Sequence, residues 1–273
     1  MSLTAQHDIR LVALDLDGTL LDTQKQIDPE TLTALHQLVE RGVQVVIASA
    51  RPPRGVRHLY QQLRLTNWQV NYNGALIWDE PSQRPIFHRP MPSDIMLELI
   101  EVARDQYDEI GVHAEVLDRW YTDRPVTTYV TETGRLFQPD GIVPIEQACA
   151  APVTKLMLMG EPYMLMKLEP ILLERFGHGV TIVSTDSHLM QIMDRRVGKA
   201  TALKKLAAHH GIRPAHIMAI GDAPNDVGML QLAGVAVAME NAVAVVKKVA
   251  DWIAPHNDQQ GVLAALRRYG LAP

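Results

Sequence analysis

In the N-terminal and C-terminal parts of the chain, apolar residues follow two patterns: short continuous runs, and a helical spacing of three and four between the runs. Short apolar runs such as Leu11–Leu14 predict buried strands, and apolar residues spaced three and four apart between the runs predict helices. After the first run, Asp28 is a good N-cap residue with Pro29 at the first helical position, and Gly42 marks a C-terminal stop. Strands and helices that alternate in this way form a parallel sheet wrapped by helices. The pattern therefore predicts a doubly wound, Rossmann-like α/β fold.

The same patterns predict the remaining elements of these two stretches. In the first stretch they are strands at 43–48, 69–72 and 75–78 and a helix at 54–63. In the second they are helices at 199–210, 242–250 and 261–269 and strands at 217–220 and 252–253, with a further helix and strand ending at Met239. Asn73 and Gly74 predict a tight turn before the strand at 75–78.

The middle of the chain has a different pattern of predicted elements. Strand-like runs dominate it at 112–117, 121–128, 154–159, 180–185 and 189–193, with a helix capped by Ser93 and another at 163–176. Four prolines cluster where the chain leaves the first stretch, as in a hinge or linker, namely Pro81, Pro85, Pro90 and Pro92. We therefore predict a core domain built from residues 1–84 and 196–273, with an α+β domain inserted at 85–195.

Composition argues against several kinds of partner. The formal net charge is −5 and both signs are scattered, so the chain lacks the basic stripe that binds nucleic-acid backbones. No apolar run approaches the roughly 18 residues of a membrane helix, and residues 1–8 lack the apolar core of a signal peptide. The single cysteine, Cys149, cannot form an intramolecular disulfide, which indicates a reducing compartment. We expect a cytoplasmic protein with no nucleic-acid polymer or membrane partner, and the oligomeric state stays open.

Residues whose side chains could act in catalysis or binding lie at the predicted carboxyl ends of strands and at one helix start. They are Asp15 and Asp17 after the first strand, Ser49, Ala50 and Arg51 after the second, Lys199 at the helix start, and Asp222, Asn225 and Asp226 after the strand at 217–220. Because ligands gather at this edge of an open α/β sheet, we expect the four groups to lie together. Carboxylates beside a cation and a hydroxyl suit phosphoryl transfer, which proteins catalyse mainly by positioning and charge compensation.

The residue types suggest a division of labour. Asp15 is a candidate for the attacking carboxylate, and Asp222 is a candidate to hold a hard cation with it; oxygen ligands of this type favour Mg²⁺. Lys199 and Ser49 are candidates to bind phosphoryl oxygens. Asp17 is placed to protonate the leaving oxygen and later to deprotonate water. Each residue alone also has an ordinary interpretation as a loop cap or a solvated charge, and their co-occurrence at one sheet edge favours the catalytic one.

With these motifs assembled, the chain resembles the haloacid dehalogenase superfamily of phosphohydrolases, and within it the Cof-type branch that carries a large α/β cap. The likeness rests on DLDGTLLD at 15–22, VVIASARP at 45–52, Lys199, and GDAPNDVGM at 221–229. Branch-specific likenesses are Asn73-Gly74-Ala75, AMENA at 238–242, and residues 257–262. The resemblance implies a core and cap, Mg²⁺ as cofactor, and hydrolysis of small phosphomonoesters such as sugar phosphates, nucleotides or phosphorylated cofactors.

The resemblance also implies roles for single residues. They are Asp15 as nucleophile and metal ligand, Asp17 as general acid/base whose backbone carbonyl binds the metal, Asp222 as metal ligand, Asp226 as support of the metal shell, and Ser49, Ala50, Lys199 and Asn225 at the phosphate. An aspartyl-phosphate on Asp15 follows from these roles. The chain departs from the family pattern at Ala50 and Glu240, where glycine is usual, and at Gln191, where glutamate is common.

Two rival functions stay open beside the phosphatase. One is a sugar phosphomutase on the same core, and the other is a non-catalytic sensor of phosphorylated metabolites, which would not need Asp17. Substrate contacts are expected from polar and aromatic residues, with the inserted domain supplying most of them. The candidates are Arg51 in the core and His113, Arg119, Trp120, Tyr121 and Arg124 in the inserted domain.

Overall fold

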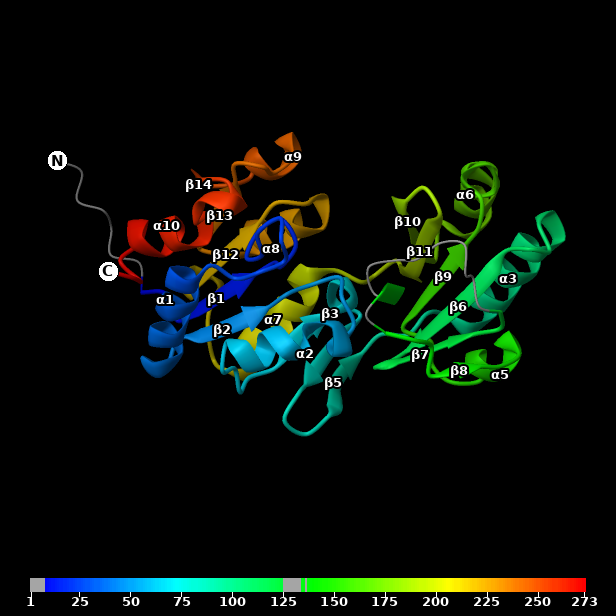
Figure 1. Ribbon diagram of the computed structural model, residues 1–273, viewed down its shortest axis with the longest axis horizontal. Coiled ribbons are helices and arrows are strands. Elements are labelled where there is room, and N and C mark those ends of the chain that lie inside the picture. Colours follow the sequence, from blue (N-terminus) through cyan, green and yellow to red (C-terminus); the bar gives the residue numbers. More distant parts are fainter. Residues whose placement is uncertain (1–7, 125–133, 136) are drawn as a thin grey trace. The chain divides into compact units, whose positions relative to one another are not determined.

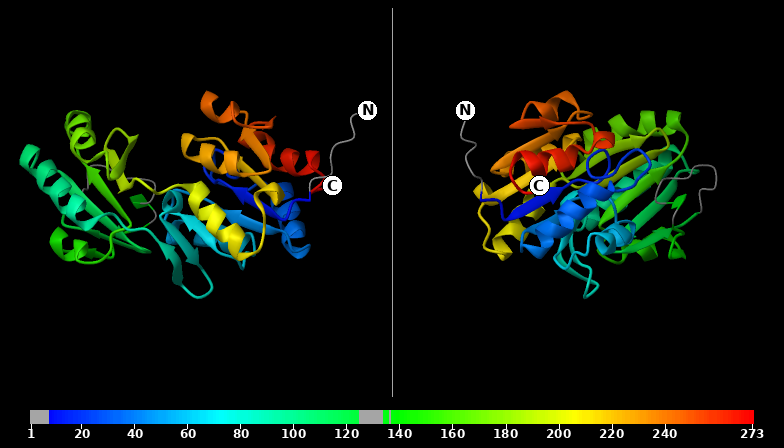
Figure 2. Two further views of the ribbon diagram at one scale, coloured as in Figure 1. Left: turned by 180° about the vertical axis from the view of Figure 1, so that it is seen from behind. Right: turned by 60° about the vertical axis from the view of Figure 1, so that its left-hand side comes forward.

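The computed structural model describes residues 8–124, 134–135 and 137–273. These residues divide into two compact units. Unit 1 holds the chain up to Ile86 and from Gly198 onward, and unit 2 is Phe87–Val197. Each unit is built around its own sheet (Figures 1 and 2).

Unit 1 contains a five-stranded parallel sheet in the order β14-β13-β12-β1-β2. Its strands are β1 (Leu11–Leu14), β2 (Gln44–Ile47), β12 (Ile217–Gly221), β13 (Val235–Met239) and β14 (Trp252–Ala254). The strand order reverses at β1, because the chain continues to β2 on one side and returns to β12 on the other. Such a reversal opens a crevice at the carboxyl ends of β1 and β12.

Helices cover this sheet on both faces. They are α1 (Pro29–Glu40), α2 (Pro53–Gln62), α7 (Lys199–His209), α8 (Val227–Leu232), α9 (Ala244–Lys247) and α10 (Gly261–Arg268). Short 3₁₀ turns lie at Tyr72–Gly74, Pro214–His216, Pro224–Asp226 and Asn257–Gln259. Side chains alternate along each strand, so Leu14 and Ile220 join a core cluster with residues of α1, α2 and α10. The doubly wound α/β prediction is confirmed.

The first helix begins as its capping residues predict. The Oδ1 atom of Asp28 accepts a hydrogen bond from the Thr31 backbone N–H at 2.9 Å, and Pro29 takes the first helical position. Leu35 and Leu38 on the same helix are fully buried in the core cluster. A local signal and a tertiary contact therefore support the same helix.

A three-stranded sheet of order β3-β4-β5 completes the described strands of the first stretch. Its strands are β3 (Gln69–Asn71), β4 (Leu76–Asp79) and β5 (Arg84–His88), and the turn between β3 and β4 is the one that Asn73 and Gly74 predict. The linker prediction is wrong at Pro85, which lies inside β5. β5 is an edge strand, where a proline without an N–H is tolerated.

Unit 2 contains a six-stranded sheet of order β10-β11-β9-β6-β7-β8. Its strands are β6 (Gly111–Val116), β7 (Arg119–Thr122), β8 (Gly141–Ile142), β9 (Lys155–Met159), β10 (Val180–Asp186) and β11 (Leu189–Asp194). Its helices are α3 (Ser93–Gln106), α5 (Ile145–Cys149) and α6 (Pro162–Phe176), whose buried residues share one core cluster with Val112 and Leu156 of the sheet. This is the α+β arrangement that the sequence predicts.

Local details of several predicted elements differ. Ser93 is the first residue of α3 and makes no capping hydrogen bond, since Pro92 takes the N-cap position. β8 and α5 are too short to show a periodic pattern, and the sequence did not predict them. α9 covers only Ala244–Lys247 of the predicted 242–250. Of the strand predicted at 121–128, residues 125–128 lie outside the described residues.

No helix among the described residues is long and apolar enough to cross a membrane.

Candidate active site

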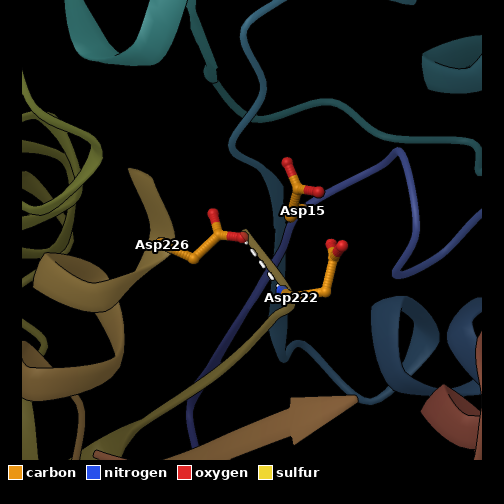
Figure 3. Close-up of side chains that lie close together, drawn as sticks. All are labelled: Asp15, Asp222 and Asp226. Carbon is orange, nitrogen blue, oxygen red and sulfur yellow. Dashed lines mark hydrogen bonds between the residues drawn. The ribbon is translucent and has the colours of Figure 1, made fainter. Parts of the chain in front are cut away.

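Three carboxylates meet at the carboxyl ends of β1 and β12. Asp15 follows the last residue of β1, Asp222 follows the last residue of β12, and Asp226 ends the adjoining 3₁₀ turn. One oxygen from each carboxylate lies within 4.8 Å of the other two (Figure 3). The sheet topology creates this cluster, since β1 and β12 are paired neighbours although their residues are about two hundred positions apart in the sequence.

Lys199 joins two of these carboxylates. It is the first residue of α7 and is fully buried, and its Nζ donates to Asp15 Oδ1 at 2.5 Å and to Asp226 Oδ1 at 2.6 Å. The second oxygen of Asp226 accepts the backbone N–H groups of Asp222 and Ala223, both at 3.0 Å. Asp226 therefore ties the lysine to the loop that carries Asp222.

The electrostatics of the cluster follow from burial and crowding. Burial, together with the carboxylates of Asp226 and Asp222, raises the pKa of Asp15 to about 7 although Lys199 opposes the shift. Burial and the neighbouring Asp226 also raise the pKa of Asp222. Burial alone would lower the pKa of Lys199, but Asp15 and Asp226 outweigh it and raise that pKa. The three carboxylates thus carry more negative charge than the ammonium group of Lys199 neutralises.

Asp222 is held by the turn that follows β1. The Thr19 hydroxyl donates to Asp222 Oδ1 at 2.8 Å. Gly18 has φ +81°, and a Cβ built on it would lie 2.5 Å from Asp222 Oδ2, so only glycine fits between the turn and the carboxylate. Thr19 is not among the residues predicted from the sequence, because its partner Asp222 lies 203 positions further along the chain.

The carboxylate of Asp17 is paired with two cationic side chains, Arg51 and Lys25. Arg51 donates to both of its carboxylate oxygens, from Nε at 2.8 Å and from Nη2 at 2.5 Å, and Lys25 Nζ lies 2.7 Å from Oδ1. Burial would raise the pKa of Asp17, but the hydrogen bonds and charges of Arg51 and Lys25 outweigh it and lower that pKa. Arg51, expected as a substrate contact, is thus a partner of Asp17 in this structure.

The residues expected at the phosphate come from two further loops. Ser49 is buried just after β2, and its Oγ accepts the Arg51 backbone N–H at 3.2 Å, with Ala50 half-buried between them. Asn225 lies in the turn before α8, and its Nδ2 donates to Asn73 Oδ1 at 2.8 Å. The structure therefore adds Asn73, at the turn between β3 and β4, to this group.

Two of the segments that resemble the Cof-type branch, residues 238–242 and 257–262, hold the loop after β1 by hydrogen bonds. Asn241 Nδ2 donates to the Gly18 carbonyl at 2.7 Å, and Asn257 Nδ2 donates to the Leu21 carbonyl at 2.9 Å. The Asn257 backbone N–H also donates to Asn241 Oδ1 at 3.2 Å. The two asparagines hold the loop between Asp17 and the first helix, a role that the sequence analysis did not assign.

The substrate candidates of unit 2 bond to one another or to their neighbours. The buried Trp120 donates its indole N–H to His113 Nδ1 at 3.1 Å, and burial lowers the pKa of His113 to about 4. Arg119 bonds Asp140 and Arg124 bonds the Asp108 carbonyl, while Tyr121 packs half-buried against the unit 2 core. Gln191 accepts a hydrogen bond from Lys155 Nζ at 3.0 Å.

Comparison with known proteins agrees with this architecture. A family model described as haloacid dehalogenase-like hydrolase matches residues 12–266. The chain is 30% identical over 270 residues to 5-amino-6-(5-phospho-D-ribitylamino)uracil phosphatase YitU of Bacillus subtilis, covering 95% of this chain and 97% of that protein. It is 28% identical over 270 residues to HMP-PP phosphatase of Serratia proteamaculans, covering 97% of this chain and 96% of the relative. A crystal structure of a haloacid dehalogenase-like hydrolase from Bacteroides thetaiotaomicron superposes with a TM-score of 0.86 at 28% identity, over 95% of this chain and 99% of that one.

The chain belongs to the haloacid dehalogenase-like hydrolase family. It is an enzyme of a hydrolase family whose named relatives include phosphatases, as the motifs of the sequence implied.

Proposed function

We propose that this enzyme is a Mg²⁺-dependent phosphatase that hydrolyses small phosphomonoesters through an aspartyl-phosphate on Asp15. The observation that carries the proposal is the cluster at the strand-order reversal, where Asp15 shares the buried Lys199 with Asp226 and lies beside Asp222. The phosphatase names of relatives that match nearly the whole chain support the same reaction.

In the first step a carboxylate oxygen of Asp15 attacks phosphorus, and the bond from phosphorus to the substrate oxygen breaks. Lys199 bonds Oδ1 of Asp15 and fixes the orientation of the carboxylate. Asp226, which bonds both the lysine and the Asp222 loop, keeps the ammonium group in place. Such fixed charges stabilise a transferring phosphoryl group because they need no reorganisation during the reaction.

Asp17 carries the proton in both steps. As an acid it protonates the departing substrate oxygen, and as a base it then takes a proton from the water that attacks phosphorus and releases Asp15 and inorganic phosphate. The pairing with Arg51 and Lys25 favours the carboxylate form, which is the form that the second step needs. To act as the acid in the first step, Asp17 must be protonated, which requires the side chains of Arg51 and Lys25 to move away from its carboxylate.

Asp15 and Asp222, with the backbone carbonyl of Asp17, are the proposed ligands of Mg²⁺. The donor set fits a hard divalent cation, because it offers carboxylate oxygens whose mutual proximity is unfavourable without one. When bound, Mg²⁺ would neutralise negative charge on the carboxylates and on the phosphoryl oxygens. Asp226 is not needed as a direct ligand, since its oxygens already bond Lys199 and two backbone N–H groups.

We further propose that the chain is divided functionally as the sequence analysis expects, with unit 2 as a cap that excludes bulk water and contacts the part of the substrate beyond the phosphate. Of the candidates in unit 2, Arg119 is exposed, whereas the Trp120 indole N–H already donates a hydrogen bond to His113 within the unit. Arg119 and Tyr121 are therefore the better substrate contacts to test first.

The test of the function is a phosphate-release assay of the purified protein with Mg²⁺ against a panel of sugar phosphates, nucleotides and phosphorylated cofactors. We expect release from at least one class and loss of release with EDTA. A flat response that EDTA does not change would contradict the proposal. Conversion of a sugar phosphate to its positional isomer without phosphate release would instead establish the phosphomutase.

Mg²⁺ is expected to raise the melting temperature, because it binds the folded carboxylate cluster and not the unfolded chain. At a hundredfold excess over its Kd the gain is about 2.7 kcal/mol, or roughly 5–10 °C for a chain of a few hundred residues. Differential scanning fluorimetry measures the shift. Asp222→Asn should remove most of it, whereas the exposed control Asp105→Asn should keep it. An equal shift in wild type and Asp222→Asn would place the ion elsewhere.

A further inference from the structure

The turn between β3 and β4 has an unusual backbone. Three successive residues lie in the left-handed region, Tyr72 at φ +48°, Asn73 at φ +54° and Gly74 at φ +97°. Glycine adopts this region freely and asparagine tolerates it, but a bulky residue such as the fully buried Tyr72 rarely does. Backbone held in sparsely populated conformations clusters at functional sites, where surrounding contacts enforce it.

The left-handed backbone turns two successive amides toward the loop expected at the phosphate. The Asn73 N–H donates to the Ser49 carbonyl at 3.0 Å, and the Tyr72 N–H donates to the Arg51 carbonyl at 3.3 Å. These two carbonyls flank Ala50, so the turn holds the loop on both sides of that residue.

The same turn is packed against the start of α7. A Cβ built on Gly74 would lie 2.4 Å from the Gly198 carbonyl oxygen, one residue before Lys199. The turn therefore fits between the loop after β2 and the helix start that carries the buried lysine. The close packing of this turn against Gly198 fixes the backbone of Asn73 and therefore the place from which its side chain extends.

The Asn73 side chain reaches the third loop of the site. Its Oδ1 accepts a hydrogen from Asn225 Nδ2 at 2.8 Å across 152 positions of sequence. An amide nitrogen carries two hydrogens, so this bond orients the second N–H of Asn225. Among the described residues no other hydrogen bond engages Asn225 Nδ2, and that N–H remains for a phosphoryl oxygen.

We propose that Asn73 is a positioning residue for the phosphoryl group. It acts through its side chain on Asn225 and through its backbone on the Ser49–Arg51 loop, and it contributes no chemistry of its own. This inference rests on the proposed phosphatase function, within which it adds a residue that lies outside the four chemical motifs. In this conformation one residue bonds both loops that are expected at the phosphate.

Asn73→Gly and Asn73→Ala separate the two contributions. Both variants remove the bond to Asn225, but only glycine keeps the left-handed backbone without strain. We expect kcat/KM to fall about tenfold in both, the factor of one lost hydrogen bond of ordinary strength, while the melting temperature falls further in Asn73→Ala. Asn225→Ala should lose about as much, and the double variant Asn73→Gly with Asn225→Ala should lose no more than Asn225→Ala alone.

Arg64→Gly is the matched control. Arg64 is another left-handed residue of unit 1, at φ +55°, and it is exposed and outside the site. This variant should keep wild-type kcat/KM. Wild-type activity in Asn73→Gly with impairment only in Asn73→Ala would overturn the proposal, because the side chain would then serve the turn alone. Fully additive losses in the double variant would also overturn it.

The affinity for inorganic phosphate, measured by isothermal titration calorimetry with Mg²⁺ present, separates this inference from the proposed function. Asn73→Gly should bind phosphate about tenfold more weakly than wild type. A chain that binds phosphate but releases none from any ester would refute the phosphatase, and weaker binding by Asn73→Gly would still support the positioning role. Equal phosphate affinity in wild type and Asn73→Gly would contradict that role even in an active phosphatase.

Discussion

Asp15→Asn is expected to lower the turnover of phosphomonoesters by about 10⁴-fold or more, the scale of loss when a nucleophile is removed from a cooperating catalytic group. The amide has nearly the shape of the carboxylate but does not attack phosphorus. The expected readout is phosphate release with Mg²⁺ on whichever ester the panel identifies. Glu40→Gln, an exposed change on α1, serves as the control and should keep full activity.

The Asp15→Asn protein should remain folded. Burial raises the pKa of Asp15 to about 7, above its value in the unfolded chain, so the Asp15 charge weakens the native state at neutral and higher pH. Lys199 also keeps its bond to Asp226 in the variant. Circular dichroism and thermal melting check this point. If the folded variant retains more than about a tenth of wild-type turnover, where a missing nucleophile predicts far less, the covalent route through Asp15 is wrong.

Lys199→Met is expected to cost both stability and activity. The methionine fills a similar volume, but it leaves the buried carboxylates of Asp15 and Asp226 without their shared cation. Removing one partner of a buried ion pair costs about 3–5 kcal/mol, a large share of the 5–15 kcal/mol typical of a folded domain. Loss of its charge at the phosphoryl group should lower kcat by a further factor of about 10²–10³.

Urea unfolding of metal-free protein measures the stability loss as a lower midpoint. Lys204→Met on the exposed side of the same helix is the matched control, and its stability should stay within about 0.5 kcal/mol of wild type. Equal midpoints for Lys199→Met and wild type would mean that the buried carboxylates do not depend on the lysine.

The core elements could be predicted because several local signals agree within each of them. Leu11–Leu14 is apolar throughout, as a strand buried on both faces must be, and it is β1 without any shift of its ends. Asp28 and Pro29 specify the start of α1 through local hydrogen bonding alone. Such signals depend on nearest neighbours in the chain, which a sequence displays directly.

The failures occurred where neighbours in space outweigh neighbours in sequence. Pro85 is typical of a linker, yet it lies in β5, because an edge strand does not need the N–H that proline lacks. β8, with only Gly141–Ile142, exists through pairing with β7, and a segment this short has no period to detect. Tertiary pairing decides such elements, and no local pattern encodes them.

For the candidate site, the residue types and their place after strands were enough to predict which side chains gather at one edge of the sheet. Asp15 and Asp222 were expected at one sheet edge because parallel strands end on the same side, and the structure brings them together with Lys199. The partners that hold these groups were not predicted. Thr19 on Asp222 and Asn73 on Asn225 are contacts across 203 and 152 positions, and nothing in either local sequence names the other.

The amino-acid sequence therefore predicted the class of fold and the carboxylates that lie together with Lys199, and the resemblance of its motifs indicated the family. Tertiary structure alone decided which oxygen of Asp15 bonds Lys199, that Arg51 binds Asp17, and that Asn73 bonds both Asn225 and the Ser49 carbonyl. The physical reason is that strand formation, capping and burial depend on a few adjacent residues, whereas a hydrogen bond between distant loops depends on how strand order brings their ends together.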